Sequence, residues 1–330
     1  MAAREILMAV IESSYGTAKT TPTLGTDACY FRLDQDNAFT GEMRPMIETI
    51  PYGGGMTVAA DDFSDADECG GELNVLLYPG IWSELLLKWA ITPVNSGRTT
   101  PWTTTDASSL MPVGDLASMS FYHAFQLPSG TYERNRYSGA KCTRWRLSAS
   151  SDQRAWRLSA SFVAIKSIGN ARDASTDPDA TEFPLPAETD YPIGPYLFSH
   201  LGSGTGTVKI GSTRTFVRGL TIGAENSLNP SRYLSRYIQT CLFTGRSSTA
   251  EAVLRTDALT DRDAFRALTA QDSEFKVDNG TRTVKVDFHN ANTITNYQRD
   301  LASGREYAHS LTVRNKFSQS SATDLTLTTT

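Results

Sequence analysis

The feature that most restricts the fold of this chain is the segment WRLSAS, which occurs at residues 145–150 and again at residues 156–161. In both copies Trp, Leu and Ala alternate with Arg and Ser, which is the period of a strand with one apolar and one polar face. Residues 152–154 between the copies predict a hairpin turn, so the two strands are expected to pair antiparallel. The sequence therefore predicts a sheet with one buried face and one face open to solvent or to a partner.

A strand followed by an amphipathic helix is predicted at residues 72–89. Apolar residues alternate with polar ones over residues 73–77, and a turn is expected at Gly80. Apolar residues then recur at helical spacing up to residue 89. This spacing places Lys88 on the exposed side of the helix.

The same order of elements recurs in the second half of the chain. Residues 251–254 form a short extended run, and Leu268 is expected to end the apolar stripe of the helix that follows. Thr260 and Asp263 have the spacing of a capping box, in which side-chain oxygens satisfy the free amides of a first helical turn. We interpret the recurrence as an internal duplication.

The duplication predicts a mainly β protein with two strand-rich halves, each carrying one helix. The first half is longer, and we assign the difference to two inserted loops, residues 51–71 and 92–117, because loop length costs little free energy. In a strand expected over residues 43–50, Pro45 favours an edge or a bulge. The predicted organisation is an N-terminal arm (1–25), a first domain (26–169), a Pro-, Asp- and Ala-rich connector (170–213), a second domain (214–320) and a flexible tail (321–330).

Composition argues against several classes of protein. The formal net charge of −5 argues against a protein that binds nucleic acid by neutralising phosphates. The four cysteines have no CxxC spacing, so we expect buried thiols in a reducing compartment rather than disulfides. The N-terminal apolar run is too short for a secretion signal, and no segment is long enough for a membrane span. A soluble protein made in the cytoplasm is expected.

No segment predicts a catalytic, cofactor or metal site. The glycines of residues 202–206 lack the spacing and the following helix of a phosphate-binding loop, and the histidines match no zinc motif. The acidic run at residues 61–68 fits only the start of a calcium loop. We interpret it as a solvated acidic loop. The functional alternative is a loop that faces a DNA channel or a neighbouring subunit. Paired carboxylates of a glycosidase have no fixed spacing, so a hydrolytic function stays open as the weaker hypothesis.

Taken together, four segments resemble the tail tube (major tail) proteins of long-tailed, non-contractile bacteriophages. They are the E-x-x-Y-G-T opening at residues 12–17, the strand–helix unit at 73–89, the paired strands at 144–163, and the run LTIGAENSLNP at 220–230. The resemblance extends over residues 11–314, and the order of these segments carries it.

This resemblance implies a subunit that is a β-sandwich or barrel with a flanking α-helix, so two such halves are expected in tandem. Strands of neighbouring copies would join into one barrel, and the rings would stack into a tail tube. The partners implied are the tape-measure protein, the tail tip and terminator proteins, and double-stranded DNA that passes without sequence-specific binding. Six domains are usual per ring, so a ring of three copies is expected, or of six if the chain is not duplicated. No cofactor, metal, membrane or enzymatic activity is implied.

The residues expected to contact other copies fall into three groups. The arm contributes Tyr15 and Gly16, and the acidic insertion contributes Asp61, Asp62 and Asp65. The arginines of the WRLSAS strands lie opposite the tryptophans, which are expected in the core, so they suit contacts with acidic residues of a neighbour. These arginines are Arg144, Arg146 and Arg157. The net negative charge is expected to keep DNA from binding the channel wall.

Two alternatives remain open at this stage. Another structural virion protein, such as a tail terminator or a capsid decoration protein, would share the β-rich composition, but it would give no reason for a duplication. A carbohydrate-binding or hydrolytic β-sandwich would need aromatic and carboxylate side chains clustered on one exposed face.

Overall fold

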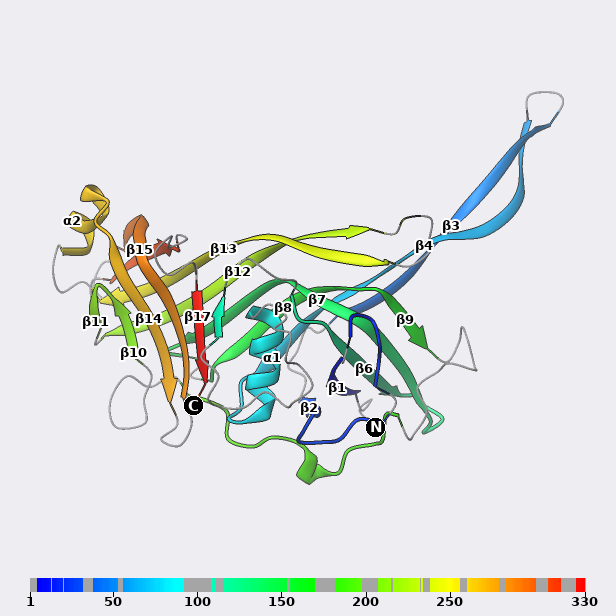
Figure 1. The fold of residues 1–330 in the computed structure, drawn as a ribbon, viewed down its shortest axis with the longest axis horizontal. Coiled ribbons are helices and arrows are strands. Elements are labelled where there is room, and N and C mark those ends of the chain that lie inside the picture. The colour runs from blue at the N-terminus through cyan, green and yellow to red at the C-terminus, as the bar shows by residue number, and fades with distance from the viewer. Residues whose placement is uncertain are drawn as a thin grey trace.

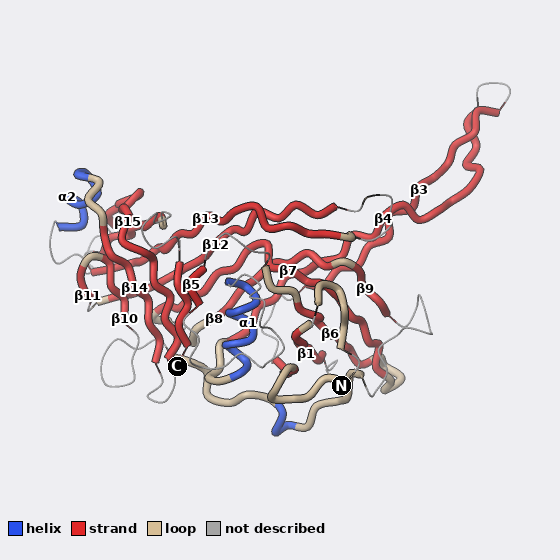
Figure 2. The backbone as a smooth tube through the Cα atoms, viewed as in Figure 1, coloured by secondary structure: helices blue, strands red, loops and turns tan. Residues whose placement is uncertain are grey.

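The computed structural model shows an elongated body from which one long hairpin projects (Figures 1 and 2). The residues that it describes are 5–12, 14–19, 21–31, 38–52, 56–91, 108–110, 116–152, 155–169, 182–197, 207–214, 216–231, 233, 238–255, 260–278, 283–300, 308–315 and 325–329.

Strands dominate the described chain, and two short α-helices interrupt them. The first half comprises β1 (Glu5–Ile11), β2 (Ala28–Phe31), β3 (Ala38–Tyr52), β4 (Met56–Leu76), α1 (Ile81–Ile91), β5 (Ser108–Leu110), β6 (Met119–Gln126), β7 (Tyr132–Ser150), β8 (Arg157–Ala164) and β9 (Lys166–Gly169). A 3-10 turn (Glu188–Asp190) lies between the halves. The second half comprises β10 (Thr207–Ile210), β11 (Ser212–Arg214), β12 (Val217–Ser231), β13 (Thr240–Arg255), α2 (Thr260–Ala267), β14 (Gln271–Asp278), β15 (Thr283–Asp300), β16 (Ala308–Arg314) and β17 (Leu325–Thr329).

These strands form one large antiparallel sheet, which confirms the mainly β prediction. In the first half β1 pairs with β2 and β6, β6 with β7, β3 with β4, β4 with β8, and β7 with β8 and β9. In the second half β10 pairs with β11 and β14, β14 with β15, β12 with β13, β13 with β16, and β15 with β16 and β17. Two pairings join the halves: β7 with β12, and β5 with β17. We call the run β3-β4-β8-β7-β12-β13-β16-β15 the central sheet.

The hydrophobic core lies against one face of the central sheet. α1 lies in the middle of the molecule, packed against β2, β7 and β17 (Figure 1). Its Trp89 is fully buried, and the indole ring contacts Phe121 and Phe162 edge-on. One apolar cluster extends from Leu7 in β1 to Phe288 in β15, so the two halves share a core.

The pairing predicted for the two WRLSAS copies is confirmed. β7 and β8 are antiparallel neighbours, with Trp145 opposite Ala160 and Leu147 opposite Leu158. All four side chains are buried, and so is Trp156 at the start of the second copy. The alternation of apolar and polar residues therefore places the arginines and serines on the opposite face of the sheet.

Both predicted helices are present, but in each of them the burial predicted for one residue was wrong. In α1 Lys88 is buried rather than exposed, because strands of both halves cover this helix. In α2 the stripe does not reach Leu268, which lies beyond the last helical residue at a φ of 49° and is 66% exposed. Asp261 is the buried residue of α2, and Ala264 and Phe265 are half-buried against the core.

Three segments that the sequence set apart from the two domains contain strands of the sheet. The expected arm, residues 1–25, includes β1, in which residues 6–10 are fully buried. The expected tail, residues 321–330, includes β17, and the expected connector, residues 170–213, includes β10. The connector also packs against the first half, where Phe183 contacts the rings of Tyr30 and Tyr122.

The acidic run that was predicted to be a loop is instead part of a strand. It lies within β4, where Asp61 and Asp62 are paired with residues of β3. Asp65 is the extra residue at a register shift next to the pair of Pro45 with Ser64, which agrees with the bulge expected for a proline in an edge strand. Backbone pairing along this hairpin, on both sides of its register shifts, outweighs the low strand propensity of aspartate. The hairpin is the element that projects from the body in Figure 1.

Candidate functional site

The face of the central sheet opposite the core is polar. Over the paired parts of β7, β8, β12, β13 and β16, alternate side chains are buried and those between them are exposed or half-exposed. We call this surface the polar face. Its polar members are Arg144, Arg146, Ser148, Arg157, Ser159, Ser161, Thr221, Glu225, Ser247, Thr249, Glu251, Ser310, Thr312 and Arg314.

The polar face is hollowed at Gly223, where β12 lies between β7 and β13. The hollow has a volume of about 270 Å³. Gly223 is one of the residues that line it, and a Cβ there would lie 2.7 Å from the carbonyl oxygen of Trp145, so the close approach of β7 leaves no room for a side chain. The side chains around it belong to Arg144, Arg146, Thr221, Glu225, Ser247, Thr249 and Glu251.

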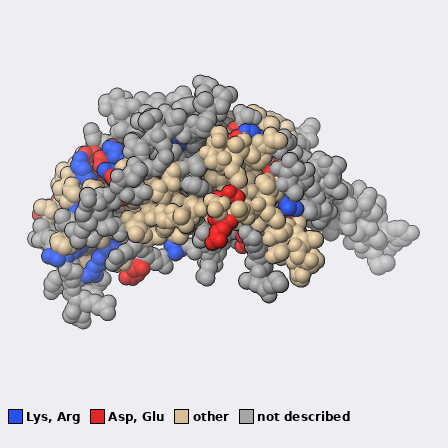
Figure 3. All heavy atoms as spheres, turned by 90° about the horizontal axis from the view of Figure 1, so that it is seen from below, with Lys and Arg blue, Asp and Glu red and all other residues tan. Residues whose placement is uncertain are grey.

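Charges of both signs lie on the polar face. The Arg144 guanidinium is 3.6 Å from the carboxylate of Glu72, and more than half of each side chain is exposed, at 56% and 57%. Such an exposed pair adds little stability because water and salt screen it. On the underside of the molecule, Figure 3 shows Lys and Arg beside Asp and Glu at the left of the view, and a group of Asp and Glu near its centre, over the described residues. The polar face therefore offers mixed charge rather than a continuous basic surface for phosphates.

The E-x-x-Y-G-T motif contributes to a buried hydrogen-bond network. Glu12 is 1% exposed, and its carboxylate accepts hydrogen bonds from the Gly16 amide at 2.9 Å, the Gly139 amide at 2.7 Å and the Ser120 hydroxyl at 2.7 Å. Both glycines have a positive φ, 74° and 67°, which other residues rarely adopt. The network ties the turn after β1 to β6 and β7.

Tyr15 of the same motif lies beside a buried lysine. The Lys141 ammonium is 4.3 Å from the centroid of the Tyr15 ring, and it also donates a hydrogen bond to the Cys241 carbonyl. Lys141 is only 1% exposed, so it needs such partners to offset the loss of water. These contacts connect the motif, β7 and β13 across the two halves.

The C-terminal carbonyls of α1 accept hydrogen bonds from the second half. The amide of Asn226 donates to the carbonyls of Ala90 at 3.3 Å and Cys142 at 3.0 Å. The guanidinium of Arg246 donates to the carbonyl of Ile91 at 2.7 Å and to the side-chain oxygen of Asn226 at 2.8 Å. The last carbonyls of a helix lack partners within the helix and carry partial negative charge, so a guanidinium there is favourable. This network joins the halves beside the β7–β12 junction.

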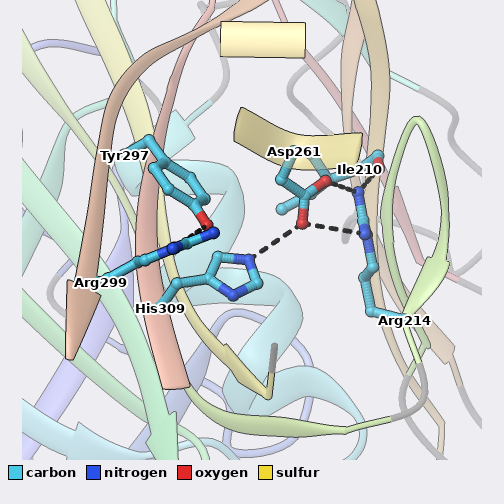
Figure 4. Close-up of polar contacts among 6 residues, drawn as sticks. All are labelled: Ile210, Arg214, Asp261, Tyr297, Arg299 and His309. Carbon is cyan, nitrogen blue, oxygen red and sulfur yellow. Dashed lines mark hydrogen bonds and ion pairs between the residues drawn. The ribbon is translucent and has the colours of Figure 1, made fainter. Parts of the chain in front are cut away.

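A buried ionic cluster holds the start of α2 (Figure 4). The Asp261 carboxylate lies 2.9 Å from Nε2 of His309 and accepts hydrogen bonds from Arg214 at 2.6 and 3.2 Å. His309 is 2% exposed, and its ring lies 5.2 Å from that of Tyr297. Burial alone would raise the pKa of Asp261, but His309 and Arg214 stabilise the carboxylate and hold its pKa below the ordinary value. The cluster ties α2 to β11 and β16.

Nothing in the described residues adds catalytic or metal chemistry to these contacts. The pairing of Asp261 with His309 is closed to substrates by burial, and no group of His, Cys, Asp and Glu in the described chain is arranged to hold a metal ion. The four cysteines are buried thiols that form no disulfide, as expected, and burial raises the pKa of Cys142 to about 12, so its thiol stays protonated.

Helices of membrane-spanning length and apolarity do not occur in the described part of the chain.

The residues predicted as contacts between copies lie in three separate places. The arginines of the WRLSAS strands share the polar face, as the alternation predicted. The three aspartates lie on the projecting hairpin, and Tyr15 and Gly16 lie beside Lys141 and Glu12. Sequence reasoning missed the networks around Asn226 and Asp261. The capping-box spacing was the sequence signal near Asp261, and Asn226 lies in the run LTIGAENSLNP, whose pattern did not predict the contact with α1.

Comparison with known proteins gives a match over most of the chain. The model of a family described as "Phage tail tube protein" matches residues 2–314. Among solved structures, a chain of the "Virion of native gene transfer agent (GTA) particle" is 18% identical, with a TM-score of 0.27, over 38% of this chain and 95% of that chain. No curated protein matches the chain.

Proposed function

This chain belongs to the phage tail tube protein family, and on that premise we propose that its copies form rings that stack into a tube and conduct DNA. As a member of the family it is a structural component of the phage tail and not an enzyme. In this proposal the tube of a long, non-contractile tail first encloses the tape-measure protein and later carries double-stranded DNA. Its two ends meet the tail tip and terminator proteins.

We infer that the chain holds two equivalent tube modules in tandem, so that three copies complete a ring of six modules. The support is the repeated pairing of strands: β1–β4 and β6–β9 make the same set of antiparallel pairs, in the same order, as β10–β17. Each long hairpin, β3–β4 and β12–β13, is followed by one helix. β5 is the additional strand, and it lies in the insertion predicted for the first half.

The polar face is proposed to line the channel. The core covers the other face of the central sheet, so only the polar face is available to a cargo that passes along the sheet. Short hydroxyl side chains and arginines placed beside carboxylates make few lasting contacts with phosphates. The net charge of −5 adds a long-range repulsion that keeps DNA moving.

The projecting hairpin is proposed to make contacts between rings. Residues 38–76 contain eight acidic residues and one arginine, whereas the equivalent hairpin, residues 217–255, contains two acidic residues and five arginines. Opposite charges favour contact between the acidic hairpin of one copy and a basic hairpin of another. Asp61, Asp62 and Asp65 belong to this interface in the proposal. Tyr15 and Gly16 are proposed to contact the neighbouring ring from the turn after β1.

Negative-stain microscopy of the purified protein, concentrated at low salt, tests the ring. The expected class averages are threefold rings with six lobes and a central hole, and native mass spectrometry should count three copies. A ring of six copies would overturn the proposal of two modules per chain. Particles that stay monomeric at every concentration, while the protein remains folded, would overturn self-assembly itself.

A further inference from the structure

Two edges of the central sheet have no strand beside them among the described residues. β3 pairs only with β4, and residues 293–300 of β15 pair only with β16. We propose that these edges bind each other between copies, so that β15 of one copy pairs antiparallel with β3 of the next. This inference rests on the proposed ring. It specifies which strands form the interface between copies, in which register they pair, and where the ring comes apart.

The junction of β7 with β12 inside the chain is the template for this interface. β7 pairs with β6 along its first part and with β8 along its second part, and β15 does the same with β14 and β16. β12 begins the long hairpin of the second half, as β3 begins that of the first half. The step from β15 to β3 of the next copy therefore repeats the step from β7 to β12. Repetition of one such contact around an axis generates a closed ring when the rotation closes.

The pairing with β8 and β16 aligns β7 with β15 residue by residue. Leu158 and Leu311 are both buried at the same place in β8 and β16, and they lie opposite Leu147 and Tyr297. Tyr297 therefore corresponds to Leu147. One residue earlier in each strand, Asn296 corresponds to Arg146.

The hairpins align β12 with β3 in the same way. Thr249 of β13 is paired with the last residue of β16, Arg314, and Glu72 of β4 is paired with the matching residue of β8, Ser161. Gly223 lies opposite Thr249, and Ala38 lies opposite Glu72, so Ala38 corresponds to Gly223.

The register of the new interface follows from these two alignments. Arg146 lies opposite Gly223 in the internal junction. Asn296 is therefore placed opposite Ala38 of the next copy, and Thr293 opposite Thr40. Thr295 has no partner in this register, because it is already the extra residue of a register shift between β15 and β16. The side chains of Thr295, Asn296 and Gln298 are exposed, so this stretch of β15 is open to a partner. An open strand edge readily pairs with strands of other chains, which favours aggregation. Closure of the ring would cover both edges and remove this risk.

The interface between copies lacks side-chain contacts that the internal junction has. Gly41 and Cys69 take the places of Asn226 and Arg246 in the alignment, and neither can donate comparable hydrogen bonds to a helix terminus. The internal junction is also bridged by the β5–β17 pair. The ring is therefore expected to open between copies and not within them.

Paired cysteines test the register in the full chain. The double variant Ala38→Cys with Asn296→Cys, oxidised in assembled rings, should give cross-linked species at twice and three times the 36.1 kDa monomer. Directly opposed residues of an antiparallel pair have Cα atoms about 4.5–5.5 Å apart, which a disulfide can bridge. The native cysteines are buried, so they do not compete.

Two control variants make the result specific. Ala38→Cys with Gln298→Cys keeps the same exposed edge but shifts the register by two residues, to roughly 7–8 Å, beyond a disulfide. It should give less than a tenth of the cross-linked product. Arg144→Cys with Glu225→Cys spans the internal junction, where these residues lie opposite each other. It should give a disulfide within one chain and no cross-linked dimer or trimer.

The outcomes distinguish failure of the proposed β15–β3 interface from failure of ring formation. Cross-linking at Asn296 but not at Gln298 supports the interface. Rings seen by microscopy without that cross-link, or with more product at Gln298, would overturn the interface while the tube stands. Loss of rings from wild-type protein under the same conditions would overturn the proposed function.

Discussion

The helices α1 and α2 each follow a long hairpin, β3–β4 and β12–β13, yet different interactions hold them against the sheet. α1 buries residues 85–91 completely and is surrounded by strands of both halves. α2 is shorter, Asp261 is its buried residue, and the ion pair with Arg214 and the hydrogen bond to His309 fix its first turn. Apolar burial is non-directional and insensitive to pH, whereas a buried carboxylate depends on its partners and its charge.

The same contrast appears at one position of the sheet. Trp156 lies just before β8 and two residues before Leu158, and His309 lies in β16 two residues before Leu311. The tryptophan packs into the core, while the histidine contacts the carboxylate of Asp261. Two helices that each follow a long hairpin are thus held against the sheet by different chemistry.

The largest effect is expected from Trp89→Ala in α1. The variant removes a fully buried ring and the 2.8 Å hydrogen bond from its indole to the Ala140 carbonyl. The free energy of unfolding should fall by about 3–5 kcal/mol, as for other buried aromatic residues, measured by urea denaturation. Trp89→Phe keeps a ring and loses the donor, so it should cost less, about 1–3 kcal/mol. Equal losses for the two variants would contradict this account of α1.

A smaller loss is expected from Asp261→Ala in α2. Removal of one partner of a buried ion pair costs about 3–5 kcal/mol, and we expect the low end because the side chain of Arg214 is 17% exposed. Hydrogen exchange should rise at the amides of α2 and stay unchanged in α1. Arg266→Ala on the same helix is the control, and its exposed side chain should make the change smaller than about 0.5 kcal/mol. Faster exchange in both helices would show that they are not held independently.

The link between α1 and the second half can be tested with Asn226→Ala. This variant leaves the carbonyls of Ala90 and Cys142 without their donor, at a cost of about 1–3 kcal/mol in unfolding free energy. Asn229→Ala is an exposed control on the same strand and should be nearly neutral. An equal effect of both variants would argue against a specific role for the Asn226 network.

The smallest effect is expected from pH, and it should be confined to α2. The pKa of Asp261 is lowered in the folded protein, so its contribution is complete above the unfolded value of about 3.9 and is lost as pH falls through the folded pKa. Hydrogen exchange corrected for intrinsic rates should therefore show α2 loosening below about pH 4 before α1 does. In Asp261→Asn this difference between the helices should not depend on pH. A wild-type difference that persists unchanged in Asp261→Asn would contradict the assignment.

Local patterns predicted most of the secondary structure near the two helices. The WRLSAS alternation predicted β7, β8 and the face of the sheet on which their arginines lie. Side chains of a strand alternate between its two faces, so burial of the apolar set places the arginines on the other face. Helical spacing located both helices. It misplaced Lys88, since whether a helix has an exposed side depends on what packs around it. The acidic strand in β4 was missed because its partner, β3, supplies the hydrogen bonds that its own residues do not favour.

The sequence by itself determined the β-rich class, the two strand–helix units and the opposition of arginine and tryptophan in β7, because these follow from residue periods over a few positions. Only the tertiary structure decided that Asp261 meets Arg214 and His309, or that Asn226 reaches the end of α1. Those partners are far apart in the chain, and no local rule sets their distance. Pairing of long antiparallel strands brings them together, and burial then makes each of these polar contacts obligatory.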